Sequence, residues 1–302
     1  MHTIAKEVRW RSQHDAAFYT VIIEGHADAD AFVQVFFTWA ADIGEAIAKV
    51  TAVAKEQEGI EHPIASELDE YDFDTLPDDV VEIGDTSVLS SGARFHFPAE
   101  EPVFRLPAGV ILSCLDGEYD PEELCPGFQI QDDEELLRLD CAVPGDELEM
   151  VFNALVEALP DIRVSWIECS DEWEDASARQ LYANEALNTP DSIQAFLRGE
   201  TENILYNGMV KFTAYCVEGR TNLLIDDHKV ISVLTFSRVI LESMSDKLRE
   251  LGFEESDELR TVVRGLHHWH YAPSGALRRQ DFIAHLLGHG FSLWKEIAAT
   301  EE

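Results

Sequence analysis

Histidines gather in one C-terminal stretch, LHHWHYAPSGALRRQDFIAHLLGHGF, where five of the chain's eleven histidines lie within residues 267–289. On a strand, alternate residues share a face, so His268 and His270 are expected to point the same way. On a helix, residues four apart are neighbours, which relates His285 to His289. Imidazole nitrogens from two adjacent elements are typical ligands of zinc. These four residues therefore form a candidate metal or acid–base site.

A structural interpretation competes with this metal site. Phe282 and Leu286 have helical spacing and are expected to occupy the buried side of the helix. His289 stands between two glycines where that helix is expected to end, and no glutamate completes an HExxH zinc motif. The sequence thus favours packed or hydrogen-bonded histidines and predicts no cofactor, with zinc as the alternative.

Acidic residues form the second group with chemical potential. The segments DEYDFDTLPDD (69–79) and DGEYDPEEL (116–124) have the charge of calcium loops. They lack the alternating Asp or Asn ligands, central glycine and terminal glutamate of an EF-hand. We therefore interpret them as solvated loops that form a partner-binding surface. The residues assigned to that surface are Glu67, Asp69, Asp72, Asp74, Asp78, Asp79, Asp116, Glu118 and Asp120.

Charge is distributed unevenly along the chain. There are 59 acidic and 22 basic residues, and the formal net charge is −37. Residues 1–200 hold 44 acids and 11 bases, whereas residues 201–302 hold 15 acids and 11 bases. Such a surface repels nucleic-acid phosphates and anionic lipids, but it attracts basic proteins. The sequence predicts a basic protein partner, and no nucleic acid or membrane; charge that serves only solubility is the alternative.

The remaining composition is that of a folded chain without a secretion or membrane signal. A hydrophobic content of 46% is sufficient for a packed core. The first residues lack the apolar region of a signal peptide, and no apolar run reaches the ~20 residues that span a bilayer. The five cysteines are scattered and form no CxxC pair, which is typical of free thiols in a reducing compartment. We expect a cytoplasmic protein.

Hydrophobic periodicity predicts an α+β fold whose N-terminal part contains a ββα unit and a βαβ unit. Strands are expected at 18–25 and 32–40, followed by a helix that ends at Gly59. Further along, strands at 136–143 and 162–169 flank a helix.

The C-terminal part is expected to follow the order ββ(β)αβα. Strands at 210–217 and 221–227 form a hairpin, a helix lies before residue 253, a strand covers 260–271, and a last helix follows. Both helices end in glycine and phenylalanine, LRELGF and LLGHGF, as in a C-cap with a hydrophobic contact. The polar segment 175–200 is interpreted as a helical connector. We therefore expect two domains, an acidic one over 1–178 and a near-neutral one over 179–302.

Two functions follow from these features. The sequence contains no GxGxxG, GxxxxGK[ST], GxSxG or HExxH motif, which favours a non-enzymatic protein. The first hypothesis is an interaction or inhibitor protein whose acidic surface binds a basic protein, such as a toxin-neutralising (immunity) protein or a mimic of nucleic-acid charge. The alternative is a hydrolase that uses the C-terminal histidines, with or without a bound metal, because catalytic groups often come from distant residues.

Overall fold

The chain forms two compact units, each assembled from separate parts of the sequence. The computed structural model describes residues 16–27, 30–84, 86–98, 104–114, 124–133, 136–174, 176–263 and 266–298. Unit 1 takes its residues from 1–103, 111–117 and 267–269, and unit 2 from 104–110, 118–266 and 270–302. Both helices and strands are present, which confirms the α+β class.

This division differs from the expected boundary between residues 178 and 179. Residue 178 begins β11 (Ala178–Asn184), which pairs with β10 (Ile162–Cys169) on one side and β16 (Ser292–Ala298) on the other. Segments from both sides of the expected boundary therefore lie in one sheet. The boundary was expected where the excess of acidic residues along the sequence ends. That excess depends on the side chains at the surface, and it does not indicate where strands pair.

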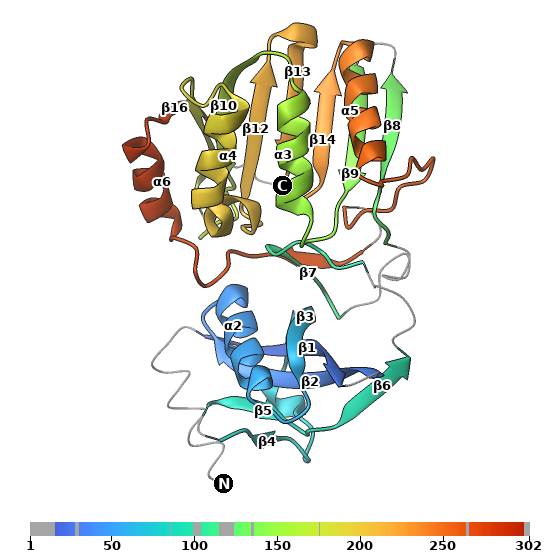
Figure 1. Ribbon diagram of the computed structural model, residues 1–302. Coiled ribbons are helices and arrows are strands. Elements are labelled where there is room, and N and C mark those ends of the chain that lie inside the picture. Colours follow the sequence, from blue (N-terminus) through green and yellow to red (C-terminus); the bar gives the residue numbers. More distant parts are fainter. Residues whose placement is uncertain are drawn as a thin grey trace. The chain divides into compact units, whose positions relative to one another are not determined.

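Unit 1 is built on a mixed sheet against which α2 (Ile43–Lys55) lies (Figure 1). β1 (Ala17–Ala27) pairs antiparallel with both β2 (Asp30–Ala40) and β3 (Glu61–Glu70), which confirms the ββα opening. The strand order is β15-β7-β3-β1-β2-β5-β4, and β6 also pairs with β2. The further strands are β4 (Val81–Glu82), β5 (Val88–Ser90), β6 (Arg94–Pro98), β7 (Val110–Leu112) and β15 (His268–His270).

Helix α2 begins and ends through local hydrogen bonds. The side chain of Asp42 accepts a hydrogen bond from the backbone N–H of Glu45, which satisfies a group that the helix leaves unpaired. The helix ends at Lys55 with Glu56 as its C-cap, so the expected end at Gly59 is wrong. A separate turn follows, in which the Ile60 N–H donates to the Gln57 carbonyl and Gly59 adopts a positive φ of 75°.

Unit 2 contains an eight-stranded sheet in the order β16-β11-β10-β12-β13-β14-β9-β8, with every neighbouring pair antiparallel. Its other strands are β8 (Gly127–Asp133), β9 (Leu136–Ala142), β12 (Val210–Cys216), β13 (Thr221–Ile225) and β14 (Ile231–Thr235). The expected β–α–β elements are present as β9, α3 (Leu148–Ala158) and β10. Three strands separate β9 from β10, so α3 makes a long crossover.

Helices cover one face of this sheet. They are α3, α4 (Pro190–Gly199), α5 (Arg238–Glu250) and α6 (Arg279–Gly288) (Figure 1). A row of buried side chains crosses the sheet beneath them, and it includes Ile167, Phe212 and Ile225. Phe152 of α3 meets Phe212 edge to face at 5.8 Å. Among the helices of the described residues, none is long and apolar enough to cross a membrane.

Three expectations for the C-terminal half are corrected. The strand expected over 260–271 is limited to β15, three residues long. The segment expected as a polar helical connector contains β11 before α4, because a strand paired on both sides can present polar side chains toward solvent. The last helix is followed by β16, whose residues are all exposed and so lack the apolar alternation by which strands are found.

The expected helix ends are confirmed for α5 and α6. The N–H of Phe253 donates to the Leu248 carbonyl, and the N–H of Phe291 donates to the Leu286 carbonyl. Gly252 and Gly290, which precede the two phenylalanines, have positive φ values of 94° and 84°. Both phenylalanines are buried, so each helix ends in a Schellman motif with its hydrophobic contact.

A buried ammonium group holds three segments of unit 2 together. Lys229, in the turn between β13 and β14, is 1% exposed. Its Nζ donates hydrogen bonds to the carbonyls of Ile204 at 3.1 Å, Asn207 at 2.6 Å and Val210 at 3.0 Å. The three N–H groups of an ammonium match three acceptors.

We expect Lys229→Met to lower the free energy of unfolding by about 2 to 5 kcal/mol, because it removes three hydrogen bonds to buried segments of the chain. Chemical denaturation of the variant and the wild-type protein measures the difference. Lys247→Met, which removes a surface ion pair with Glu250, is the matched control and should change the free energy of unfolding far less. A similar small loss for both variants would show that the Lys229 hydrogen bonds are dispensable.

Candidate functional site

The four predicted histidines form two pairs, His268 and His270 on β15 and His285 and His289 at the end of α6. His285 and His289 have ring centroids 4.1 Å apart, and Glu200 lies beside them. His270 lies in unit 2 with its ring centroid 4.6 Å from that of His228. His268 belongs to unit 1. Among the described residues, His285 and His289 lie together, as their helical spacing predicts. His268 and His270 do not belong to the group of possible metal ligands that contains His285 and His289.

The position of Glu200 depends on the end of α4. Pro190 starts this helix after a Thr189–Ser192 capping box, and Glu200 is its C-cap. A π-helical turn, Thr201–Leu205, follows directly, and such turns often occur at functional sites. Glu200 Oε1 lies 2.6 Å from His285 Nε2, and Glu200 Oε2 accepts a hydrogen bond of 2.8 Å from Asn203 Nδ2. Both carboxylate oxygens are therefore held in place.

The turn from Asp226 to Lys229 concentrates perturbed titratable groups. Burial, together with the charge of Asp227, raises the pKa of Asp226 to about 6. Burial opposes ionisation of Asp227, but hydrogen bonds from His228 and Lys211 outweigh it and lower the pKa of Asp227. Burial lowers the pKa of Lys229 to about 7, against the attraction of the two carboxylates.

These charges are paired in an alternating chain across the strands. Lys211 Nζ lies 3.0 Å from Asp227 Oδ2 and 3.6 Å from Glu168 Oε1. Arg179 Nη1 lies 3.6 Å from the same oxygen of Glu168. His228 Nδ1 lies 2.8 Å from Asp227 Oδ1. Two carboxylates whose pKa values differ can act as an acid and a base in catalysis. Networks of ion pairs also perturb pKa values when they only stabilise a turn, and stabilisation of this turn accounts for all the contacts described above.

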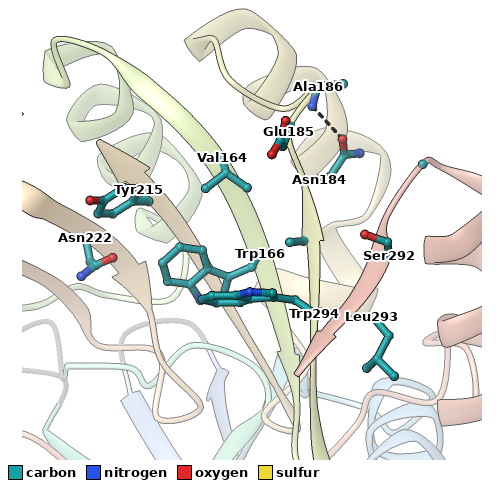
Figure 2. Close-up of a pocket in the computed structure, with 12 residues that line it drawn as sticks. Val164, Trp166, Asn184, Glu185, Ala186, Tyr215, Asn222, Ser292, Leu293 and Trp294 are labelled. Carbon is teal, nitrogen blue, oxygen red and sulfur yellow. Dashed lines mark hydrogen bonds between the residues drawn. The ribbon is translucent and has the colours of Figure 1, made fainter. Parts of the chain in front are cut away.

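An aromatic groove lies on the face of the unit 2 sheet opposite the helices. Ile167 of β10 is buried under the helices, so the alternation of the strand turns Trp166 to the other face. Figure 2 shows the Trp166 and Trp294 rings overlapping, with a centroid distance of 5.5 Å. The groove has a volume of about 990 Å³. Its lining residues are Val164, Trp166, Ala183, Asn184, Glu185, Ala186, Tyr215, Asn222, Gly290, Ser292, Leu293 and Trp294.

The lining of the groove combines aromatic rings with a few polar side chains. Its aromatic rings offer flat faces on which planar or sugar-like rings can stack. Asn222 and Glu185 add polar groups at two different positions around the tryptophans (Figure 2). Glu185 is the one ionisable carboxylate among these lining residues, and no histidine, lysine or cysteine accompanies it in this described lining.

The acidic residues expected to bind a partner fall into three classes. Glu67 and Asp69 lie on β3, and Asp69 accepts hydrogen bonds from Ser113 Oγ, the Cys114 N–H and Trp269 Nε1 within unit 1. Burial raises the pKa of Glu67, and Cys114 hydrogen bonds to it. Asp116, Glu118 and Asp120 lie outside the described residues. The remaining four, Asp72, Asp74, Asp78 and Asp79, are exposed.

These four acids belong to residues 70–80, which we call the acidic loop. Its apolar residues Tyr71, Phe73, Leu76 and Val80 pack against a buried cluster formed by Phe18, Phe37, Trp39 and Leu89. The Phe73 ring meets the Phe18 ring edge to face at 5.1 Å. The acids between these anchors point to solvent, so the loop has an apolar inner side and a charged outer side.

Hydrogen bonds fix the backbone of the acidic loop. Asp72 Oδ1 accepts from the Asp74 N–H at 3.0 Å, and the Thr75 hydroxyl donates to the Asp72 carbonyl at 2.7 Å. The Val80 N–H donates to the Pro77 carbonyl, which forms a turn with Asp78 and Asp79 at its tip. The charged groups are therefore displayed from an ordered loop.

Some of these residues were not found by sequence reasoning. Glu200 is 85 residues from His285, so no local spacing relates the two. Trp166 had a usable signal, because strand alternation in IRVSWIEC places it opposite Ile167. Lys229 had none, since a lysine in a turn normally faces solvent.

We expect Asp227→Asn to destabilise the protein by about 1 to 3 kcal/mol at mildly acidic pH, where both charges of the Asp227–His228 pair are present. Because the pKa of Asp227 is lowered in the folded protein, its ionised carboxylate stabilises the fold above pH 3.8. This stabilisation is lost as the pH falls through the pKa of Asp227 in the folded protein. The raised pKa of His228 gives stability that is complete below 6.5 and is lost as pH rises through its folded value. The difference in unfolding free energy between Asp227→Asn and the wild-type protein should therefore be largest between pH 3.8 and pH 6.5.

Thermal or chemical unfolding over a pH series measures that gap, with Asp161→Asn, an exposed acid of unit 2, as the control. A gap for Asp227→Asn that stays constant from acid to alkaline pH would show that the pair does not contribute.

Comparison with known proteins adds no relative to these observations. No protein-family model matches the chain, and no curated protein or solved structure matches it. The function must therefore be inferred from the side chains of the chain itself.

Proposed function

We propose that this protein binds a basic protein partner through the acidic loop and acts as an inhibitor that masks the partner's positive surface. The observation that carries the proposal is the exposure of Asp74, Asp78 and Asp79 on a loop whose four apolar residues pack against the aromatic cluster. A loop that is already ordered loses little conformational entropy on binding.

The charge around the loop supports the same interpretation. Residues 16–103 contain nineteen acidic residues and three basic ones. Lys49, one of those three, already lies 2.6 Å from Glu45. A field of this sign draws a cationic protein toward the loop and raises its association rate. Val81, 63% exposed next to the loop, adds an apolar contact of the kind that the centres of interfaces contain.

The chemistry of the partner follows from this surface. Lysine and arginine side chains on the partner would pair with carboxylates that lie on a fixed backbone. Proteins that bind nucleic acids and basic toxins carry such surfaces, so the proposed class includes toxin-neutralising proteins and mimics of nucleic-acid charge. A hydrolase that uses the C-terminal histidines is the second class considered, and the grouping of Glu200, His285 and His289 is the observation that favours it.

The test is retention of a partner from extract of the native host by immobilised protein at low and high salt. We expect one stoichiometric basic protein, released by high salt because screening weakens exposed charge pairs. The triple variant Asp74→Lys, Asp78→Lys and Asp79→Lys should lose it. With the purified partner, this variant should associate at least about 10-fold more slowly at low salt, with a smaller change in dissociation.

The matched control reverses three exposed acids of unit 2, Asp161, Glu242 and Glu258, and so makes the same change in net charge. This control should retain the partner. Equal loss from both triple variants would assign binding to net charge alone and remove the acidic loop from the interface. Failure of the wild-type protein to retain any basic protein at low salt would reject the proposed function.

A further inference from the structure

We propose that Glu200, His285 and His289 bind a divalent transition-metal ion, and that zinc is the ion that these ligands fit best. The proposal concerns unit 2 and does not depend on partner binding by the acidic loop. Each residue offers one ligand atom, and the three atoms lie within 4.8 Å of one another. Two imidazoles and one carboxylate form a common ligand set of zinc sites that keep a coordination position open.

The distances require only small movements to admit the ion. Ligand atoms around a tetrahedral zinc at bond lengths of about 2.0 to 2.2 Å lie roughly 3.3 Å apart. Glu200 Oε1 and His285 Nε2, now 2.6 Å apart in a hydrogen bond, would separate slightly. His289 is exposed, and its ligand atom already lies within 4.8 Å of the other two. The proton between Glu200 and His285 would leave as the ion binds.

Hydrogen bonds that do not use the proposed ligand atoms already orient His289 and Glu200. His289 Nδ1 lies 2.9 Å from the carbonyl oxygen of His285, which can only accept a hydrogen bond. The proton is therefore on Nδ1, and the lone pair of Nε2 is left for a metal. Asn203 donates to the second oxygen of Glu200 at 2.8 Å. Metal ligands usually have outer partners of these two kinds, which fix the ring and the carboxylate.

The electrostatic setting favours a cation. Glu200 caps the C-terminal end of α4, and His285 and His289 occupy the last turn and the C-cap of α6. Two helix C-termini, each with partial negative charge, therefore meet at the three side chains. The net charge of −37 raises the local concentration of divalent cations around the whole chain.

Burial decreases in order from Glu200 to His289. The Glu200 side chain is 9% exposed and that of His285 is 32% exposed, whereas His289 is exposed. The Phe196 ring lies 6.2 Å from the His289 ring and forms an apolar wall with Phe291. The carboxylate thus lies inside, and the fourth coordination position faces the solvent side, where water would complete the shell.

The other candidate group in the described part of unit 2, Asp226, Asp227 and His228, is less suited to a metal. Lys211 already pairs with Asp227 at 3.0 Å, and the buried Lys229 lies in the same turn. A cation at that turn would meet two ammonium groups. Glu200 has His285 and Asn203 as its hydrogen-bond partners, and a metal ion would replace the proton of the first and leave the second in place.

Calorimetric titration of untagged, chelator-treated protein with zinc tests the proposal, and bound cobalt, read from its visible absorption, reports the ligand geometry. We expect one zinc per chain at neutral pH. His289→Gln, a change at an exposed position, should weaken binding by about 100-fold or more, and Glu200→Gln should do the same. Asn203→Ala, which frees the Glu200 oxygen, should weaken it by about 10-fold. Zinc should raise the unfolding temperature of wild type but not of His289→Gln.

His96→Gln, which removes an exposed histidine of unit 1, is the matched control and should bind zinc like the wild-type protein. Absence of zinc binding by the folded wild-type protein would overturn the proposal. So would binding that persists unchanged in both His289→Gln and Glu200→Gln, because the ion would then be held elsewhere. Loss of zinc binding has no consequence for the acidic loop, so the two proposals can fail separately.

Discussion

The structure of unit 2 depends on one lysine that has no access to water. The Lys229 ammonium bonds to carbonyls of the π-helical turn, of the segment after it and of β12. It therefore ties the β13–β14 turn to the chain that follows α4. The same turn of π-helix carries Asn203, which holds Glu200, so the position of the glutamate is linked to the cation in the β13–β14 turn. An ammonium is rarely buried unless each of its donors is satisfied, and here all three are.

The two units differ in whether their charged side chains are paired with charges of opposite sign. In unit 2, Arg179, Glu168, Lys211 and Asp227 alternate in sign across neighbouring strands, so each charge has a partner close by. In residues 16–103 of unit 1, acids greatly outnumber bases, and the acids of the acidic loop are exposed. The acidic loop contains both exposed acids and apolar residues that pack against the aromatic cluster. Burial of these apolar side chains offsets the repulsion between the carboxylates.

Local features were predictable from the sequence, and long-range ones were not. The ββα opening and both glycine–phenylalanine helix ends follow from periodicity and from backbone geometry within a few residues. Strand order does not, because β9 and β10 are separated by three strands that appear later in the chain. The same limit applied to the site. The spacing of His285 and His289 predicted their proximity, whereas Glu200 joins them only through the packed arrangement of α4 and α6. Polar strand β11 was missed since its side chains resemble those of a linker.

Strand β16 is the outermost strand of the unit 2 sheet, and Trp294 on it is 61% exposed. One edge of such a strand has backbone N–H and C=O groups free to pair with another chain, and exposed apolar side chains strengthen that tendency. Aggregation through this edge is opposed by the repulsion between molecules that each carry a charge of −37. Colloidal stability should therefore depend on conditions that leave the fold intact: concentrated salt, or acidity that neutralises the carboxylates, removes the repulsion while the edge remains.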